Sequence, residues 1–130
     1  MGFVLGKRSK KNLRGVHPDL VAVVERAIEI TGQDFTVIEG VRSKKRQREL
    51  VAKGFSKTMN SRHITGHAVD VIPYPIPGSW EKYKRGQWTA IYEAMKQASE
   101  ELNVPLQYGY EWGWDKPHYQ LHWDHYGKDS

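Results

Sequence analysis

The chain has 130 residues, of which 38% are hydrophobic, and its 5 Trp and 7 Tyr favour one folded domain over a disordered chain. It contains no cysteine, which excludes a disulfide framework and a thiolate metal site and leaves His, Asp and Glu as metal ligands. The net charge of +5 is uneven, because residues 1–62 carry 14 Lys and Arg against 6 Asp and Glu, whereas residues 63–130 carry 6 against 9.

The first half of the chain predicts a helix, a strand and a second helix. Residues 17–32 predict a helix, because apolar side chains recur on one face and Pro18 suits the first turn. The β-rich segment 34–42 predicts a short strand. Residues 43–54 predict a helix whose N-terminus is capped by Ser43.

The N-terminal segment also bears on export and on partners. In the stretch MGFVLGKRSKK, too few apolar residues precede the first charged residues to form the apolar region of a secretory signal. We therefore expect synthesis in the cytoplasm without an export signal. The runs GKRSKK and RSKKRQR predict a basic face that could contact phosphate. No aromatic residue is interleaved in either run, as stacking on single strands would require. We therefore expect no specific nucleic-acid partner and at most weak contact with an anionic membrane.

The second half predicts three strands and one helix. A polar loop leads to a strand at 68–72, which a proline-rich loop ends. Residues 87–103 predict the longest helix, and 105–110 and 118–124 predict two short strands. The order indicates an α+β fold, with a small, mostly antiparallel sheet, helices packed to one side, and a metal site at the sheet edge and loops. We expect residues 1–130 to form a single domain.

The stretch SRHITGHAVDV, residues 61–71, raises the question of a metal site. His63 and His67 stand four apart, as in helical zinc sites, but no Glu follows His63 and Gly66 lies where that helix should be strongest. Strand alternation instead places Asp70 on the face opposite its two valine neighbours. Because an unpaired aspartate is costly to bury, Asp70 requires a metal or an arginine partner.

A catalytic zinc site usually has three protein ligands and one open position for water. His63 and Asp70 supply two of them. Three candidates for the third lie near the C-terminus: His118, His122 and His125. Asp115 precedes His118 by three residues and could accept the proton that water loses. His122 shares the predicted strand face with His118 and so remains a rival.

These motifs resemble those of a family of zinc peptidases. SRHITGHAVDV fits the pattern S-x-H-x-x-G-x-A-x-D and DKPHYQL fits D-x-x-H, in the order found in phage L-alanyl-D-glutamate endolysins, bacterial D-alanyl-D-alanine carboxypeptidases and dipeptidases. GVRSKKRQRELVAKG resembles the upstream segment of that family, where an arginine meets the substrate. With VHPDL near the start, the resemblance covers nearly the whole chain and is greatest to the short single-domain phage endolysins.

The resemblance also implies roles for individual residues. It implies three zinc ligands: His63, Asp70 and His118. It makes Asp115 the general base, and it makes Arg42 and Ser61 substrate-binding residues, with Arg42 orienting the scissile carbonyl. His67 falls on a variable position of the pattern, so the resemblance implies no role for it. The carboxypeptidases and dipeptidases more often have Glu at the place of Asp115, which favours the endolysins.

The function implied is that of a zinc-dependent peptidoglycan hydrolase that cuts the L-Ala–D-Glu bond of stem peptides during host lysis. We expect a monomer without a wall-binding domain, which leaves the host cytoplasm for the periplasmic peptidoglycan once a holin has permeabilised the membrane. The alternatives are a D-Ala-D-Ala carboxypeptidase or dipeptidase, a non-hydrolytic metal-bound binding module, and a nucleic-acid-binding protein. Asp115 argues against the binding module, which needs no proton acceptor.

Overall fold

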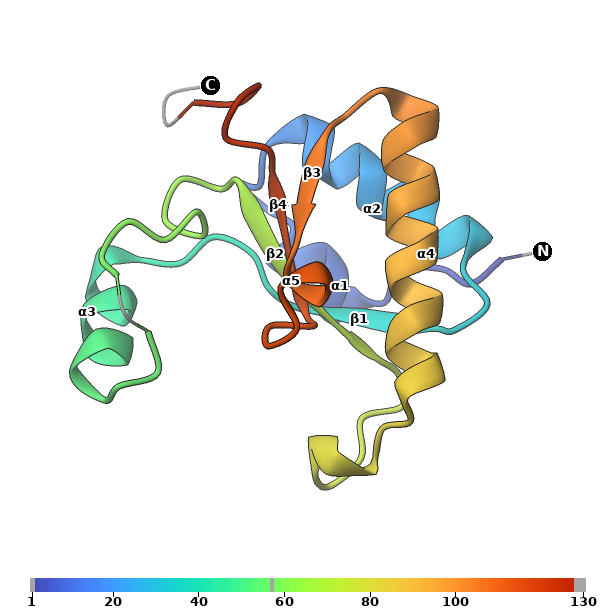
Figure 1. Ribbon diagram of the computed structural model, residues 1–130, viewed down its shortest axis with the longest axis horizontal. Helices are drawn as coiled ribbons and strands as arrows, with labels where there is room; N and C mark the ends of the chain where they lie inside the picture. The colour runs from blue at the N-terminus through green and yellow to red at the C-terminus, as the bar shows by residue number, and fades with distance from the viewer. Residues whose placement is uncertain (1, 57, 128–130) are drawn as a thin grey trace.

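The computed structural model describes residues 2–56 and 58–127 and confirms the α+β class (Figure 1). Its four strands form one antiparallel sheet in the order β1-β2-β4-β3, so that β2 and β4 are central. The strands are β1 (Phe35–Glu39), β2 (Ala68–Pro73), β3 (Leu106–Tyr108) and β4 (His118–Leu121).

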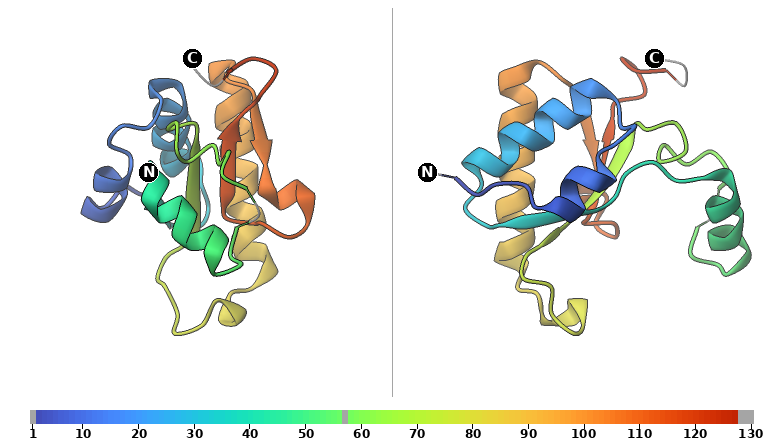
Figure 2. Two further views of the ribbon diagram at one scale, coloured as in Figure 1. Left: turned by 90° about the vertical axis from the view of Figure 1, so that its left-hand side faces the viewer. Right: turned by 180° about the vertical axis from the view of Figure 1, so that it is seen from behind.

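Two long helices pack against each other and against one face of this sheet. The helices are α1 (Lys7–Asn12), α2 (Pro18–Ile30), α3 (Lys44–Ala52), the 3-10 turn η1 (Trp80–Lys82), α4 (Arg85–Leu102) and α5 (Gly109–Trp112). Figure 1 shows α2 and α4 side by side, whereas α3 lies apart from them on the other side of the molecule, as the rear view in Figure 2 also shows. Within the described ranges, no helix combines the length and the apolar character needed to cross a membrane.

The two faces of the sheet differ because successive residues of a strand point to opposite sides. The central strands contribute four side chains to the core under α2 and α4: Val69, Val71, Tyr119 and Leu121. Asp70 lies between Val69 and Val71, and His118 directly precedes Tyr119, so both point to the opposite face. The alternation predicted for 68–72 is confirmed.

Helix α1 covers the outer edge of β1. Ser9 Oγ accepts a hydrogen bond of 2.9 Å from the Val37 amide, and Asn12 Nδ2 donates one of 2.9 Å to the Val37 carbonyl. These contacts satisfy backbone groups that an edge strand would otherwise leave unpaired. Apolar periodicity gives no helix signal here, because KRSKKN has no apolar stripe.

Candidate active site and metal centre

A row of three polar residues crosses the open face of the sheet. Asp70 on β2 lies directly opposite His118 on β4. On the other side, the register between β1 and β2 shifts after Val37, so that Glu39 lies opposite Asp70. This irregularity turns Glu39 away from the core face that Phe35 and Val37 occupy, as a β-bulge does.

The loop before β2 brings His63 to the same row. Arg62 anchors this loop, because its Nη2 donates to the carbonyls of Leu121 (2.9 Å) and Tyr126 (2.7 Å). Gly66 has a φ of +76°, and a Cβ there would lie 2.7 Å from the Gly15 carbonyl oxygen. Glycine is therefore needed at 66 for the turn and for close packing against the N-terminal segment.

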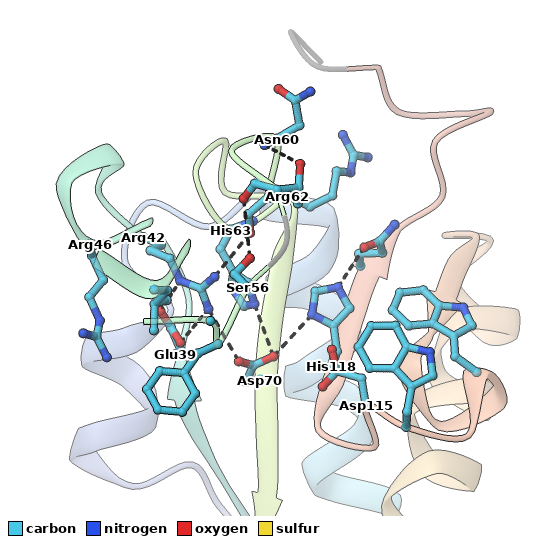
Figure 3. Close-up of a pocket in the computed structure, with 18 of the residues that line it drawn as sticks. Glu39, Arg42, Arg46, Ser56, Asn60, Arg62, His63, Asp70, Asp115 and His118 are labelled. Atoms are coloured by element: carbon cyan, nitrogen blue, oxygen red, sulfur yellow. Dashed lines mark hydrogen bonds and ion pairs between the residues drawn. The ribbon is translucent and has the colours of Figure 1, made fainter. Parts of the chain in front are cut away.

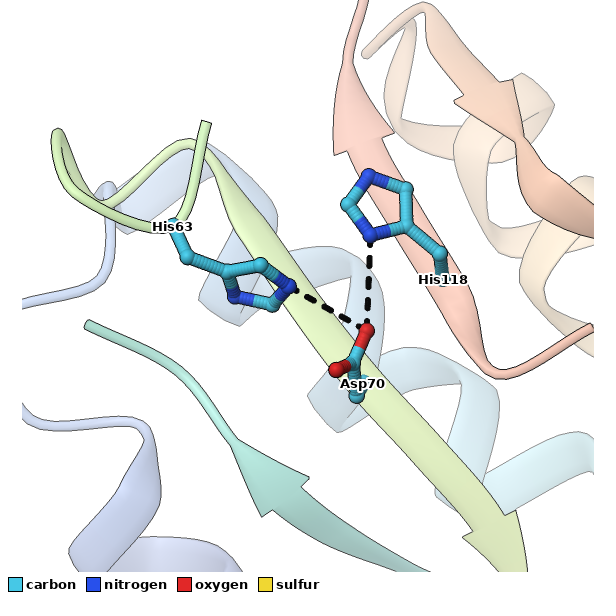
Figure 4. A group of neighbouring side chains, drawn as sticks. All are labelled: His63, Asp70 and His118. Carbon is cyan, nitrogen blue, oxygen red and sulfur yellow. Dashed lines mark hydrogen bonds and ion pairs between the residues drawn. The ribbon is translucent and has the colours of Figure 1, made fainter. Parts of the chain in front are cut away.

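His63, Asp70 and His118 converge at one point (Figure 4). Their candidate ligand atoms all lie within 4.8 Å of one another. Asp70 Oδ1 lies 3.2 Å from His63 Nε2 and 3.4 Å from His118 Nδ1, and all three residues are largely buried. The cluster thus lies over the two central strands and the loop that precedes β2.

The outer nitrogen of each histidine is held by a hydrogen-bond acceptor. His63 Nδ1 donates to the Gly40 carbonyl (2.9 Å), and His118 Nε2 donates to Gln120 Oε1 (2.7 Å). Gln120 is fixed in turn, because its Nε2 donates to Gln107 Oε1 (2.9 Å). In neutral histidines the inner nitrogens then carry lone pairs, which face the Asp70 carboxylate. Three acceptors that point at one place fit a bound cation, so the cluster could hold a metal ion.

Without a bound cation, a protonated inner nitrogen can instead donate to the Asp70 carboxylate. Burial by itself would raise the pKa of Asp70, but hydrogen bonds with His118 and His63 bring the pKa well below its usual range. Conversely, burial would lower the pKa of His118, and the contact with Asp70 raises it. The site therefore stabilises a negative carboxylate next to positive charge.

Arg42 lies between the two acidic residues of the row. Its Nε and Nη2 bind the Glu39 carboxylate at 2.6 and 2.8 Å, and Nη2 lies 3.9 Å from Asp70 Oδ2. Its Nη1 donates to Gln47 Oε1 (2.8 Å) and to Ser61 Oγ (3.4 Å). The guanidinium offsets the repulsion between the facing carboxylates of Glu39 and Asp70.

Asp115 approaches the cluster from the turn before β4. The Asp115 carbonyl accepts a hydrogen bond from the His118 amide (3.1 Å). The turn is tight, because a Cβ on Gly109 would lie 1.9 Å from the Asp115 carbonyl oxygen. Burial raises the pKa of the Asp115 carboxyl, the neighbouring His118 lowers it and Asp70 raises it further, with a net increase.

The three residues of the cluster line one cleft of about 680 Å³, together with Arg42 and Asp115. Figure 3 shows Arg42, Arg46 and Glu39 on one side of Asp70, with His118 and Asp115 on the other. Ser61 also lines this cleft, and its Oγ accepts a hydrogen bond of 3.2 Å from the His63 amide. Every site residue predicted from the sequence thus borders the same cavity.

The remaining histidines that the sequence raised as candidates lie elsewhere. His122 and His125 contact each other, with ring centroids 5.6 Å apart, beyond the end of β4. His67 is buried at the start of β2, where its Nδ1 contacts Thr65 Oγ1 at 2.7 Å. None of these three belongs to the cluster.

Sequence reasoning missed several residues of the cleft. Glu39 could have been noticed as the acid three residues before Arg42, but its orientation depends on the bulge. Gln120 follows His118 by two residues, so strand alternation gave a usable signal. Trp112 and Trp114 line the cleft from the segment between the predicted strands 105–110 and 118–124, to which the sequence pattern assigns no role.

Comparison with known proteins identifies the family. A family model for phage L-alanyl-D-glutamate peptidases matches residues 1–125. The chain belongs to this family. The L-alanyl-D-glutamate peptidase of Escherichia phage T5 is 36% identical to this peptidase over 115 residues, which cover 86% of this chain and 83% of the relative. That of Listeria phage A118 is 32% identical over 106 residues, or 78% of this chain but only 35% of the longer relative.

A solved structure is also similar to this peptidase. The crystal structure of the Serratia marcescens L-Ala D-Glu endopeptidase ChiX matches it with a TM-score of 0.85 and 42% sequence identity, over 96% of this chain and 94% of that one. These matches confirm the family resemblance found in the motifs and the assignment of the protein as a peptidase.

Proposed function

We propose that this peptidase is a zinc-dependent peptidoglycan hydrolase, an endolysin that cleaves the L-Ala–D-Glu bond of stem peptides. The observation that carries the proposal is the convergence of His63, Asp70 and His118 in a cleft that Asp115 also lines. The bond is chosen because the family and its named relatives are described as acting there. Trimming of D-Ala-D-Ala termini remains the alternative that the experiment below tests.

The donor set favours zinc. His63 Nε2, Asp70 and His118 Nδ1 would supply two nitrogens and one oxygen, a combination typical of catalytic zinc, whereas calcium and magnesium prefer oxygen ligands alone. When bound, zinc would lower the pKa of water toward neutrality and polarise the scissile carbonyl. The hydrogen bonds to Gly40 and Gln120 would keep both imidazoles oriented for that task.

Asp115 would serve as the general base. It lines the cleft beside His118, and its raised pKa moves it toward the range in which a carboxylate can accept and return a proton. We propose that Asp115 takes a proton from the attacking water and gives it to the leaving D-Glu nitrogen.

Arg42 and Ser61 would bind the substrate. Glu39 fixes the Arg42 guanidinium at the border of the cluster, so its positive charge is in place before substrate arrives. We propose that Arg42 stabilises the negative charge that develops on the L-Ala carbonyl oxygen. Ser61 contacts both Arg42 and the backbone of His63, and would position them against the peptide.

The biological setting forms part of the proposal. The hydrophobic cluster formed by the described residues supports one catalytic domain, which we propose acts as a monomer. It would reach the periplasmic peptidoglycan from the host cytoplasm after holin-dependent permeabilisation of the membrane. The net charge of +5 would favour approach to an acidic polymer and weak contact with anionic lipid.

Mass spectrometry of digested peptidoglycan tests the bond. We expect glycan strands that end in L-Ala and free peptides that begin with D-Glu, and we expect zinc at about one ion per chain, as in mononuclear catalytic sites. Chelator-treated enzyme should leave the peptidoglycan intact, and added zinc should restore cleavage. Free D-Ala or D-Ala-D-Ala as the main product would reject this bond in favour of the carboxypeptidase or dipeptidase.

A further inference from the structure

The cleft has two chemically different walls. On one side of Asp70 lie Arg42 and Arg46 (Figure 3). On the other side His118 leads to a pair of indole rings, because the Trp112 ring centroid lies 5.4 Å from that of His118 and 5.6 Å from that of Trp114. We call these the basic wall (Arg42, Arg46) and the aromatic wall (Trp112, Trp114).

The aromatic wall is exposed but firmly supported. Trp112 and Trp114 are 40% and 77% exposed, although large apolar side chains are normally covered. Trp112 lies on α5, which is tied to α4, because Tyr110 contacts Thr89 (2.8 Å) and Glu111 accepts a hydrogen bond from Tyr92 (2.5 Å). Gly113, with φ +84°, ends α5 and lets the chain turn between the two indoles. Exposed aromatic rings on a fixed support are typical of a binding surface.

The proposed substrate is also different on its two sides. L-Ala is joined through a lactyl group to a muramic acid sugar, so a neutral pyranose ring lies only one residue and one linker, about 7 Å of extended chain, before the scissile bond. After that bond come D-Glu and, in peptidoglycan of the diaminopimelate type, diaminopimelate, and both carry a free carboxylate. A substrate that crosses the cluster from wall to wall therefore places a sugar against one wall and carboxylates against the other.

We propose that the aromatic wall binds the muramic acid sugar and that Arg46 of the basic wall binds the carboxylates after the scissile bond, while Arg42 faces the scissile carbonyl, an orientation that rests on the proposed function. The apolar C–H face of a pyranose ring packs well on an indole, whereas a carboxylate gains nothing there. Asp115 lines the cleft beside His118 and would repel the acidic part of the peptide, whereas the charge of Glu39 on the other side is offset by its ion pair with Arg42. On the opposite side, Arg46 is half-exposed and lies 3.6 Å from Glu49, an exposed pair that Arg46 can exchange for a substrate carboxylate.

Two soluble substrates test the role of each wall. One is the disaccharide tetrapeptide GlcNAc–MurNAc–L-Ala–D-Glu–diaminopimelate–D-Ala, and the other is the same tetrapeptide without the sugars. The wild-type enzyme should cleave the first with a kcat/KM about tenfold higher, a factor that corresponds to one well-packed aromatic contact. Trp114→Ala should remove this preference by lowering kcat/KM roughly tenfold on the disaccharide substrate only. Trp114→Phe, which keeps a ring, should retain most of the preference.

Arg46→Gln should give a different pattern. It should lower kcat/KM equally for both substrates, because both carry the carboxylates. Trp80→Ala is the matched control, since Trp80 is 47% exposed on η1 and does not line the cleft. It should leave both rates unchanged.

Equal losses on both substrates in Trp114→Ala, or a wild-type enzyme without preference for the sugar, would overturn the orientation while leaving the bond assignment intact. Unchanged rates combined with weaker binding to phosphatidylglycerol vesicles would assign Trp114 to a membrane contact and also overturn it. If the wild-type enzyme cuts neither substrate after L-Ala but removes D-Ala, the proposed function fails and the orientation fails with it.

Discussion

The two faces of the central strands carry opposite chemistry within a few residues. Val69 and Val71 point into the core, and Asp70 between them points into the cleft. The core face is stabilised by apolar burial, which is non-directional and tolerates small adjustments. The cleft face depends on directed contacts, in which Glu39, Arg42 and Asp70 satisfy one another's charges.

This difference indicates that the faces can be disrupted separately. A substitution on the cleft face should change metal binding or catalysis with little effect on folding. A substitution on the core face should lower the free energy of unfolding and leave the chemistry intact. Each prediction below disrupts one of the two faces.

The largest effect is expected from loss of a cluster histidine. His118→Ala removes one of the three converging donors, so the protein should lose its bound metal and its hydrolysis while keeping its circular dichroism spectrum. His122→Ala and His67→Ala are the matched controls, because neither residue belongs to the cluster, and both should keep the metal. Metal analysis of the three purified variants decides the matter, and a metal-free His122→Ala or His67→Ala protein would reject the ligand set.

Asp115→Asn should have the next largest effect. The amide keeps the shape of the side chain but cannot accept a proton, so kcat should fall by roughly two to four orders of magnitude. Metal content and thermal stability should stay close to wild type, since Asp115 is not one of the three converging donors. Near-normal turnover would exclude Asp115 as the base, and loss of metal would instead make it a ligand.

Gln120→Ala should have an intermediate effect. It removes the acceptor that holds His118 Nε2, and partners of this kind usually contribute 10- to 100-fold to metal affinity. Competition with a chromogenic chelator measures the change directly. Gln97→Ala on the exposed side of α4 is the control and should leave metal affinity unchanged. An unaltered affinity in Gln120→Ala would show that His118 needs no outer partner.

The cluster could be located from the sequence only in part. Strand alternation placed Asp70 correctly because residues 68–72 form one regular strand. The same rule gave His118 and His122 one face, but β4 ends at Leu121 and the His122 amide donates to the Pro105 carbonyl (3.0 Å). The end of a strand depends on its neighbours in space, so spacing alone could not choose between the two histidines.

Other parts of the site depend on contacts that no local pattern records. Regular alternation from Phe35 and Val37 would put Glu39 in the core, and only the shifted register with β2 brings it to the cleft. Helix α1 forms although KRSKKN lacks an apolar stripe, because its polar side chains bind the edge of β1. In both cases tertiary contacts outweigh local propensity.

The smallest effect on chemistry is expected from Val71→Ala, which disrupts the core face alone. Val71 is fully buried, and the loss of its two methyl groups should lower the free energy of unfolding by about 2 kcal/mol, between the usual costs of Ile→Val and Leu→Ala. The melting temperature should fall by roughly 5 to 10 °C. Val4→Ala is the control, because Val4 is 82% exposed and should tolerate truncation.

At 25 °C, well below the transition, Val71→Ala should keep its metal affinity and its kcat/KM, because Asp70 is held in place by backbone pairing with β4 and by its cleft-side partners. A marked loss of metal affinity in Val71→Ala would show that core packing sets the position of Asp70, and the two faces could then no longer be treated as independent.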